Sequence, residues 1–232
     1  MDRPYIICHM VTSIDGKVTG DFLYTEAGCR AAEQYYAIHR DLCADGFACG
    51  RVTMEGSFTG GWMPVLSDYK GAVVPNGDFV ADENARFYAL SFDRKGRLGW
   101  KKGYIEDEDP GYDCAHVVEV LTENASREYL AYLRDIGASY IIAGREELDL
   151  PLALAKAKEL FGIERLLLEG GSVLNGAFLR AGAVDELSVV VAPTLADAAD
   201  KPLFDGGFQT EFVLTASTVW EKDILRLTYK KI

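Results

Sequence analysis

Basic residues are scarce in this 232-residue sequence: 24 lysines and arginines stand against 36 aspartates and glutamates, which gives a formal net charge of −12 at pH 7. This excess of negative charge repels the backbone of a nucleic acid and an anionic membrane surface, so we expect neither as a partner. A ligand that carries phosphate must therefore bind in a local pocket of cationic side chains or backbone amides.

Cysteine and histidine are also few, and neither is arranged for metal binding. The five cysteines are scattered and include no Cys-x-x-Cys pair, which argues against a disulfide framework or a zinc site and favours free thiols in a reducing cytoplasm. His9, His39 and His116 have no carboxylate or second histidine at ligand spacing. We expect no metal site, and we interpret the histidines as hydrogen-bonded, partly buried side chains.

Other familiar signatures are missing too. The sequence has neither an apolar run of membrane-spanning length nor a cationic leader, so we expect a cytoplasmic protein. It lacks the Gly-x-Gly-x-x-Gly fingerprint of a Rossmann domain, the Gly-x-Ser-x-Gly elbow of a hydrolase and the Gly-Lys-Ser/Thr phosphate loop. A dinucleotide site of the usual Rossmann kind is therefore excluded.

Short apolar runs alternate with segments of helical spacing along most of the chain. This alternation predicts a mainly parallel sheet covered on both faces, within a single domain spanning residues 1–232. The predicted strands are 5–11, 46–50, 87–92, 116–121, 139–143 and 165–169, and the predicted helices are 26–42, 51–57, 126–136 and 150–161.

The middle and the end of the chain depart from this alternation. Residues 60–86 carry glycine, proline and aspartate without periodicity, which makes 60–113 the least regular part of the predicted domain. Residues 187–193 are apolar throughout and predict a further strand. Residues 224–230 alternate apolar and polar side chains, which predicts an antiparallel strand paired with 212–221 in a terminal hairpin.

The loop Ser13–Lys17 follows the first predicted strand, at the edge where open α/β sheets place ligands. Gly16 permits a sharp turn, and Ser13, Asp15 and Lys17 supply a hydroxyl, a carboxylate and an ammonium close together. Two interpretations remain open, an ordinary Asp-Gly turn with a solvated lysine and a substrate-binding loop.

Two further motifs join a strand to a helix. In Gly50–Met54, free backbone N–H groups and Arg51 suit a phosphate, although a simple turn explains the glycine equally well. In Leu166–Ser172, an apolar strand leads to Glu169, then to two glycines that permit close approach of a pyrophosphate, then to Ser172 as a predicted helix N-cap. A plain turn needs only one glycine, so the pair favours ligand binding.

A cluster of cations follows the third predicted strand. It either holds a phosphate of a cofactor or substrate, or forms a solvated hairpin tip that balances the acidic run 106–109. Its members are Arg94, Lys95, Arg97, Lys101 and Lys102.

Taken in order, these motifs resemble the reductase domain of riboflavin-biosynthesis proteins. The resemblance implies a three-layer, dihydrofolate-reductase-like α/β fold, NADPH as hydride donor, and reduction of a phosphoribosylamino-pyrimidine to its ribitylamino form. It also implies a homodimer, for which the apolar strand 187–193 is one candidate surface, although a buried core strand explains this apolar run equally well. The His-x-Glu and Pro-Cys-x-x-Cys motifs of the neighbouring zinc deaminase do not occur, so we expect a stand-alone reductase. The segments that carry the resemblance are 13–17, 50–55, 168–172, 182–187 and 189–193.

Residue by residue, the resemblance implies that Lys17 and Asp15 orient the sugar and the pyrimidine, and that Glu169 is a polar group at the reacting end. Either Lys17 or Glu169 handles the proton, with Asp15 as a supporting charge. Ser13 and Arg94 are candidate substrate ligands. The implied cofactor-binding residues are Gly50, Arg51, Thr53, Gly170, Gly171 and Ser172.

Two other functions remain open. One is a reductase of another small heterocycle, such as dihydrofolate or a pterin, for which Glu26 and Glu33 are candidate binding acids. The other is a non-catalytic NADPH-binding module, in which residues 60–86 cover the substrate side or serve a partner.

Overall fold

The computed structural model describes residues 2–206 and 209–232. The chain divides into two compact units. The central unit consists of Asp45–Glu164 together with the N-terminal tail up to Pro4, and the terminal unit consists of Tyr5–Ala44 together with Arg165–Ile232. The expectation of a single domain over residues 1–232 stays a prediction.

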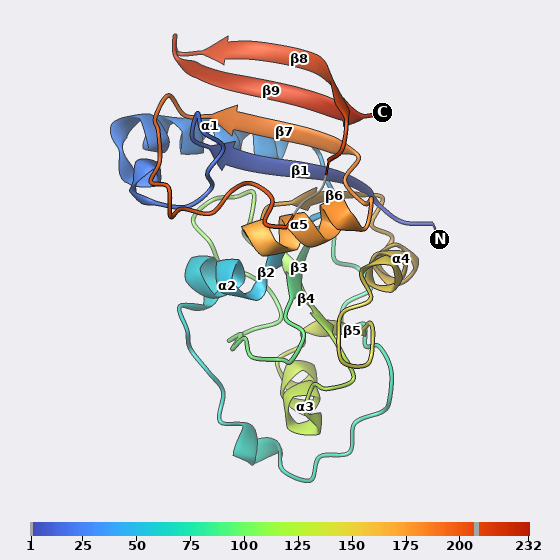
Figure 1. Ribbon diagram of the computed structural model, residues 1–232. Coiled ribbons are helices and arrows are strands. Elements are labelled where there is room, and N and C mark those ends of the chain that lie inside the picture. The colour runs from blue at the N-terminus through green and yellow to red at the C-terminus, as the bar shows by residue number, and fades with distance from the viewer. Residues whose placement is uncertain (1, 207–208) are drawn as a thin grey trace. The chain divides into compact units, whose positions relative to one another are not determined.

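The central unit contains four parallel strands in the order β5-β4-β3-β2 (Figure 1). Nearly every strand residue is buried, as expected for parallel strands, which read as continuous apolar runs. The predicted strands are confirmed to within one residue at each end. The observed bounds are β2 (Gly46–Gly50), β3 (Tyr88–Phe92), β4 (His116–Leu121) and β5 (Ser139–Ile142).

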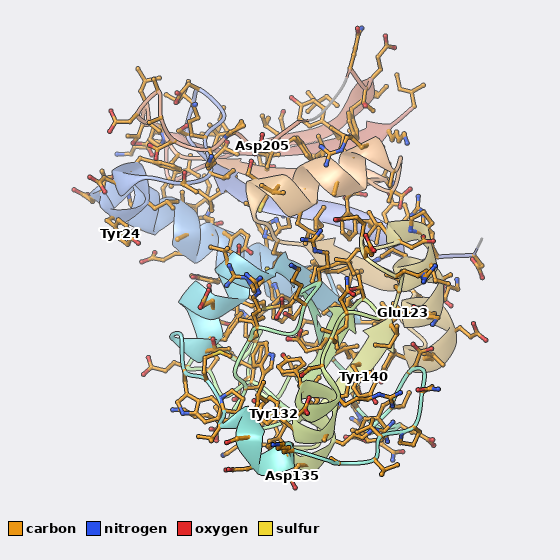
Figure 2. All side chains as sticks on the ribbon, turned by 60° about the horizontal axis from the view of Figure 1, so that its bottom comes forward. Tyr24, Glu123, Tyr132, Asp135, Tyr140 and Asp205 are labelled. Atoms are coloured by element: carbon orange, nitrogen blue, oxygen red, sulfur yellow. The ribbon has the colours of Figure 1, made fainter. Side chains whose placement is uncertain are left out.

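In the rest of the central unit, three short helices come before two longer ones. The predicted helix 51–57 is a single α-helical turn that continues as a π-helix. Residues 60–86 contain no helix longer than η3, and the Tyr69 hydroxyl at its end donates to Asp135 of α3 at 2.8 Å (Figure 2). The helices are α2 (Arg51–Met54), η2 (Glu55–Thr59), η3 (Leu66–Tyr69), α3 (Arg127–Asp135) and α4 (Leu150–Phe161).

The terminal unit contains five strands in the order β6-β1-β7-β9-β8. β1 runs parallel to both of its neighbours, β6 and β7, whereas β9 is antiparallel to β7 and forms a hairpin with β8. The predicted parallel arrangement with a C-terminal antiparallel hairpin is thus confirmed (Figure 1). The bounds are β1 (Tyr5–Thr12), β6 (Arg165–Leu168), β7 (Glu186–Val191), β8 (Phe212–Trp220) and β9 (Ile224–Lys231).

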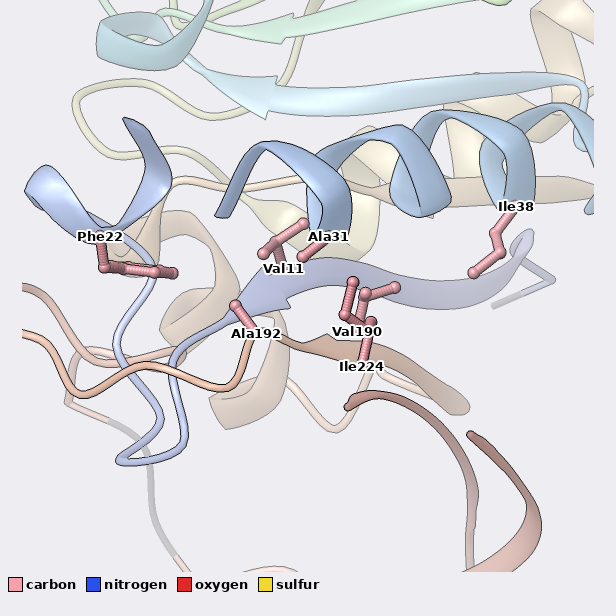
Figure 3. Close-up of a cluster of buried hydrophobic side chains, with 7 residues drawn as sticks. All are labelled: Val11, Phe22, Ala31, Ile38, Val190, Ala192 and Ile224. Atoms are coloured by element: carbon pink, nitrogen blue, oxygen red, sulfur yellow. The ribbon is translucent and has the colours of Figure 1, made fainter. Parts of the chain in front are cut away.

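One long helix, α1 (Glu26–Asp41), packs on this sheet. Thr25 caps it by accepting a hydrogen bond from the Gly28 N–H at 3.0 Å. Its apolar face contacts β1 and β7 through a buried cluster drawn in Figure 3. The cluster consists of Val11, Phe22, Ala31, Ile38, Val190, Ala192 and Ile224.

The remaining helices of the terminal unit are η1 (Asp21–Tyr24) and α5 (Ser172–Arg180). The prediction that Ser172 caps α5 is wrong, because Gly171 is the N-cap and Ser172 is already helical. The Ser172 hydroxyl donates instead to the carbonyl of Pro202. Among the described residues, no helix combines the length and apolarity that crossing a membrane requires.

Candidate active site

The loop after β1 is held by the segment that follows β7. The N–H of Ile14 donates to the Thr194 carbonyl at 2.9 Å, and the N–H of Val18 donates to the Lys201 carbonyl at 2.9 Å. These bonds place the loop Ser13–Lys17 at the carboxyl end of β1, the edge of a parallel sheet at which ligands bind.

The polar side chains of this loop interact with one another and with the same segment. The Ser13 hydroxyl donates to Asp15 Oδ1 at 2.7 Å, and the Ala196 N–H donates to the same oxygen at 3.0 Å. These two bonds, that from Ala196 first, lower the pKa of the Asp15 carboxyl. Lys17 Nζ donates to the carbonyls of Ala198 at 3.2 Å and Asp200 at 2.9 Å. An ammonium has three protons, so Lys17 keeps one donor for a ligand.

The Gly-Gly turn after β6 meets this loop through Pro202. Pro202 forms an isolated antiparallel bridge with Lys17, and its carbonyl accepts the Ser172 hydroxyl. The next residue, Leu203, donates its N–H to the Gly16 carbonyl at 3.0 Å. The structure therefore brings together two predicted motifs that are remote in the sequence.

The turn itself requires glycine at its first position. Gly170 has φ +103°, which side chains rarely adopt, and an added Cβ would lie 3.3 Å from Cε of Met10. The peptide bond between Gly170 and Gly171 is cis. Asp205 lies beside α5 (Figure 2), and its N–H donates to the Ser172 carbonyl at 3.0 Å, which fixes the start of the helix.

Glu169 lies directly before this turn and is buried. Its Oε1 lies 2.7 Å from Nδ1 of His39, and each side chain is only 2% exposed. The sequence prediction treated His39 as a hydrogen-bonded core residue and missed this partner. The position of His39 on α1, beside the apolar Ile38, indicates that the histidine is buried. It does not identify a carboxylate in another part of the chain as its partner.

A second histidine lies nearby on β1. The ring of His9 stacks on Tyr35 of α1 with centroids 4.4 Å apart. Burial lowers the pKa of His9, so the ring is neutral. Its Nε2 lies 3.0 Å from the Tyr35 carbonyl, and its Nδ1 lies 3.1 Å from both the carbonyl and the hydroxyl of Ser188. His9 is thus a hydrogen-bonded core histidine, as predicted.

In the central unit, Arg51 and Arg94 line one cavity of about 220 Å³ with Lys95 and Arg97. Arg51 also pairs with Glu55 one turn along the helix, with Nη1 2.5 Å from Oε2. Four cationic side chains at one cavity give it the local positive charge that an anion needs in an acidic protein.

Other residues around this cavity have settled partners. Asp93 also lines it, and its carboxylate accepts the backbone N–H of Leu98 at 2.8 Å. Arg94 pairs with Glu147. Gly50 is the N-cap of α2, and Thr53 lies half-buried on α2 without lining this cavity.

The predicted cluster of five cations does not stay together. Lys101 and Lys102 line a different cavity of about 210 Å³, which Trp100 also lines. Lys102 pairs with Glu106, Nζ lying 2.5 Å from Oε1. The expected balance between basic and acidic runs therefore applies to Lys102.

The chain is similar to known proteins in both sequence and structure. The family of the RibD C-terminal domain matches residues 113–226. A 2,5-diamino-6-ribosylamino-4(3H)-pyrimidinone 5′-phosphate reductase from Methanothermobacter thermautotrophicus is 30% identical over 206 residues, which cover 88% of this chain and 85% of that protein.

Two solved structures show the same fold. A pyrimidine reductase-like protein from Corynebacterium diphtheriae has a TM-score of 0.69 at 21% identity, over 99% of this chain and 92% of that one. A riboflavin biosynthesis reductase from Saccharomyces cerevisiae has a TM-score of 0.64 at 15% identity, over 99% and 90% of the two chains.

Proposed function

Because the chain belongs to the family of the RibD C-terminal domain, the reductases of riboflavin biosynthesis, it is an oxidoreductase, and we propose that NADPH is its hydride donor. We propose as substrate a 5-amino-6-(5-phosphoribosylamino)uracil-type pyrimidine, which is reduced to its ribitylamino form. The observation that carries this proposal is the meeting of the Ser13–Lys17 loop with the Gly170–Ser172 turn at Pro202. A loop with a carboxylate and an ammonium suits a sugar phosphate, and a Gly-Gly turn suits a pyrophosphate.

Each unit, taken by itself, has residues that suit a part of the proposed cofactor. In the central unit, the cavity lined by Arg51, Arg94, Lys95 and Arg97 supplies cations for the phosphate that distinguishes NADPH from NADH. Arg94 serves equally as a ligand of a substrate phosphate. We also assign Gly50 and Thr53 to cofactor binding, and in the terminal unit Gly170, Gly171 and Ser172.

When bound, NADPH supplies a hydride from C4 of its nicotinamide, and opening of the ribose ring provides the acceptor, a C=N bond between C1′ and the amine nitrogen. The hydride adds to C1′ and a proton adds to the nitrogen, which gives the ribitylamino product. We assign the proton to Glu169 or Lys17, with Asp15 as a supporting charge and Ser13 as a substrate ligand. The main task of the protein is to hold donor and acceptor in contact.

The test follows loss of reduced-nicotinamide absorbance with three acceptors. These are the aminouracil named above, the corresponding 2,5-diamino-pyrimidinone, and dihydrofolate. Turnover of either phosphoribosylamino compound with NADPH is the expected result, and the ratio of the two decides the substrate. Turnover of dihydrofolate alone contradicts the proposal, and tight NADPH binding without oxidation by any acceptor indicates a binding module.

We further propose that the enzyme is a homodimer. β8 is an edge strand of the terminal sheet, and it exposes Val213, Leu214 and Val219. An apolar edge of this kind is a surface for pairing with a second copy. Light scattering on the purified protein should give twice the mass of the chain, and Val219→Lys should shift it toward the monomer.

A further inference from the structure

His39 and Glu169 are 130 positions apart in the sequence and meet inside the terminal unit. Nδ1 of His39 lies 2.7 Å from Oε1 of Glu169, and both side chains are almost fully buried. A carboxylate removed from water is strongly destabilised unless another group replaces the lost hydration. The imidazole N–H is such a group, and it donates directly to the carboxyl oxygen.

The backbone around both residues is fixed. Ile38 packs into the apolar cluster of Figure 3, and Tyr35 stacks on His9, so α1 is held against β1 next to His39. On the other side, Leu168 pairs with Cys8 of β1 immediately before Glu169. The His39 imidazole therefore lies at the end of β6, beside Glu169.

Two further titratable groups of the terminal unit, Cys8 and His9 of β1, interact electrostatically with Glu169. Burial raises the pKa of the Cys8 thiol and lowers that of the His9 imidazole, so both are uncharged near neutral pH. An imidazole in contact with the carboxylate is thus its local basic partner.

We propose that His39 is a positioning residue of the reductase: its imidazole, with Nδ1 2.7 Å from Oε1, holds the Glu169 carboxyl in one orientation, ready to exchange the proton of the reduction. His39 acts through Glu169 and touches no reacting atom itself. This inference rests on the proposed function, because it takes Glu169 as a group of the reacting end.

The first test compares two replacements of His39. His39→Leu removes the donor, and we expect kcat to fall about a hundredfold with little change in the KM for NADPH. His39→Asn keeps an N–H at the branch position of Nδ1, so it should recover roughly tenfold of that loss. Equal losses for Leu and Asn, or an unchanged kcat for Leu, overturn the proposal.

A matched control separates positioning from stability. His116 is another buried histidine, on β4, and its Nε2 lies 2.7 Å from the Ser139 hydroxyl. His116→Asn should lower the melting temperature and leave kcat unchanged. A comparable loss of kcat in this control would mean that His39→Leu reports only damage to the fold.

The second test is a double-mutant cycle. If His39 acts through Glu169, His39→Leu should cost no further kcat in a Glu169→Gln background. An additive loss would show that the two residues act independently, which overturns the proposal.

A third measurement needs no substrate. In protein labelled with ¹⁵N-histidine, the His39 Nδ1 resonance, identified by its absence in His39→Asn, should shift in Glu169→Gln. An unchanged resonance means that the pair does not form in solution, and the inference fails. Failure of the proposed function is distinguished from this outcome, because it appears as no turnover of either pyrimidine by the wild-type enzyme.

Discussion

Two buried glutamates, one in each unit, have opposite surroundings. Glu119 lies in the middle of β4, where the Trp100 indole N–H donates to its Oε1 at 2.5 Å and its Oε2 has no hydrogen-bond partner among the described residues. Burial, and then the charge of Asp93, raise its pKa well above the usual value. Glu169 lies at the end of β6, with the imidazole of His39 at its oxygen.

This difference teaches how burial becomes useful for chemistry. A carboxyl that is buried without a basic partner takes up a proton and becomes a neutral part of the core, as Glu119 does. A carboxyl that is buried at a strand end beside an imidazole and a ligand-binding turn retains the means to exchange a proton. In our proposal the central unit contributes the cations for a phosphate, whereas the terminal unit carries the proton chemistry together with the Gly-Gly turn that suits a pyrophosphate.

The largest effect on kcat is expected from replacing Glu169 by glutamine, compared with the same replacement of Glu119. Glu169→Gln should lower kcat by about two to four powers of ten, because the reaction loses its acid–base group. Glu119→Gln, the matched control, should leave kcat within about twofold, because burial raises the pKa of the Glu119 carboxyl and Glu119 lies outside the proposed site. Steady-state kinetics on the verified pyrimidine measures both, and equal effects would remove the distinction between the two sites.

Lys17 tests the terminal unit from the other motif. Lys17→Ala should lower turnover by about one to three powers of ten, with the core and NADPH binding nearly intact. The ammonium donates to two carbonyls of the segment after β7, so Lys17→Arg is the useful companion variant. Unchanged kinetics for Lys17→Ala would leave the ammonium as an anchor of the loop and assign the proton to Glu169.

Arg51 tests the central unit. Arg51→Ala should raise the KM for NADPH about tenfold and leave that for NADH and the kcat unchanged, because the guanidinium lines the cationic cavity. Lys102→Ala is the control, since Lys102 lines a different cavity and pairs with Glu106. A fall in kcat rather than a rise in KM would contradict the division between the units.

The smallest expected effect concerns stability and pH. The folded-state pKa of Glu119 is raised. The contribution of its neutral carboxyl to the free energy of unfolding is therefore fully present below the unfolded-state pKa of about 4.3, and this contribution is lost as the pH rises toward the folded-state pKa. The free energy of unfolding of Glu119→Gln, relative to that of the wild type, should therefore rise by up to about 1.4 kcal/mol for each pH unit above the unfolded-state pKa. Denaturant unfolding at pH 5 and pH 7 measures the difference, and parallel curves would show that Glu119 ionises freely.

Local signals explain why most of the fold was predictable. Strands such as Gly46–Gly50 and His116–Leu121 are apolar runs bounded by turn residues, and the start of α1 carries its own cap in Thr25. The cap of α5 was misplaced by one residue. Serine is a common N-cap, and the sequence does not show that Ser172 is already helical while Gly171 has the extended backbone of the cap. The five cations were expected together, yet Lys101 and Lys102 line a different cavity from Arg94, Lys95 and Arg97.

The sequence by itself determined the elements, their mainly parallel order and the glycine and charged motifs, because each depends on residues within a few positions of one another. Tertiary structure alone decided that Pro202 joins the Lys17 loop to the start of α5, and that His39 meets Glu169. Those contacts join segments that come together only when the strands assemble into the sheet. No local preference encodes which distant side chain fills a buried position.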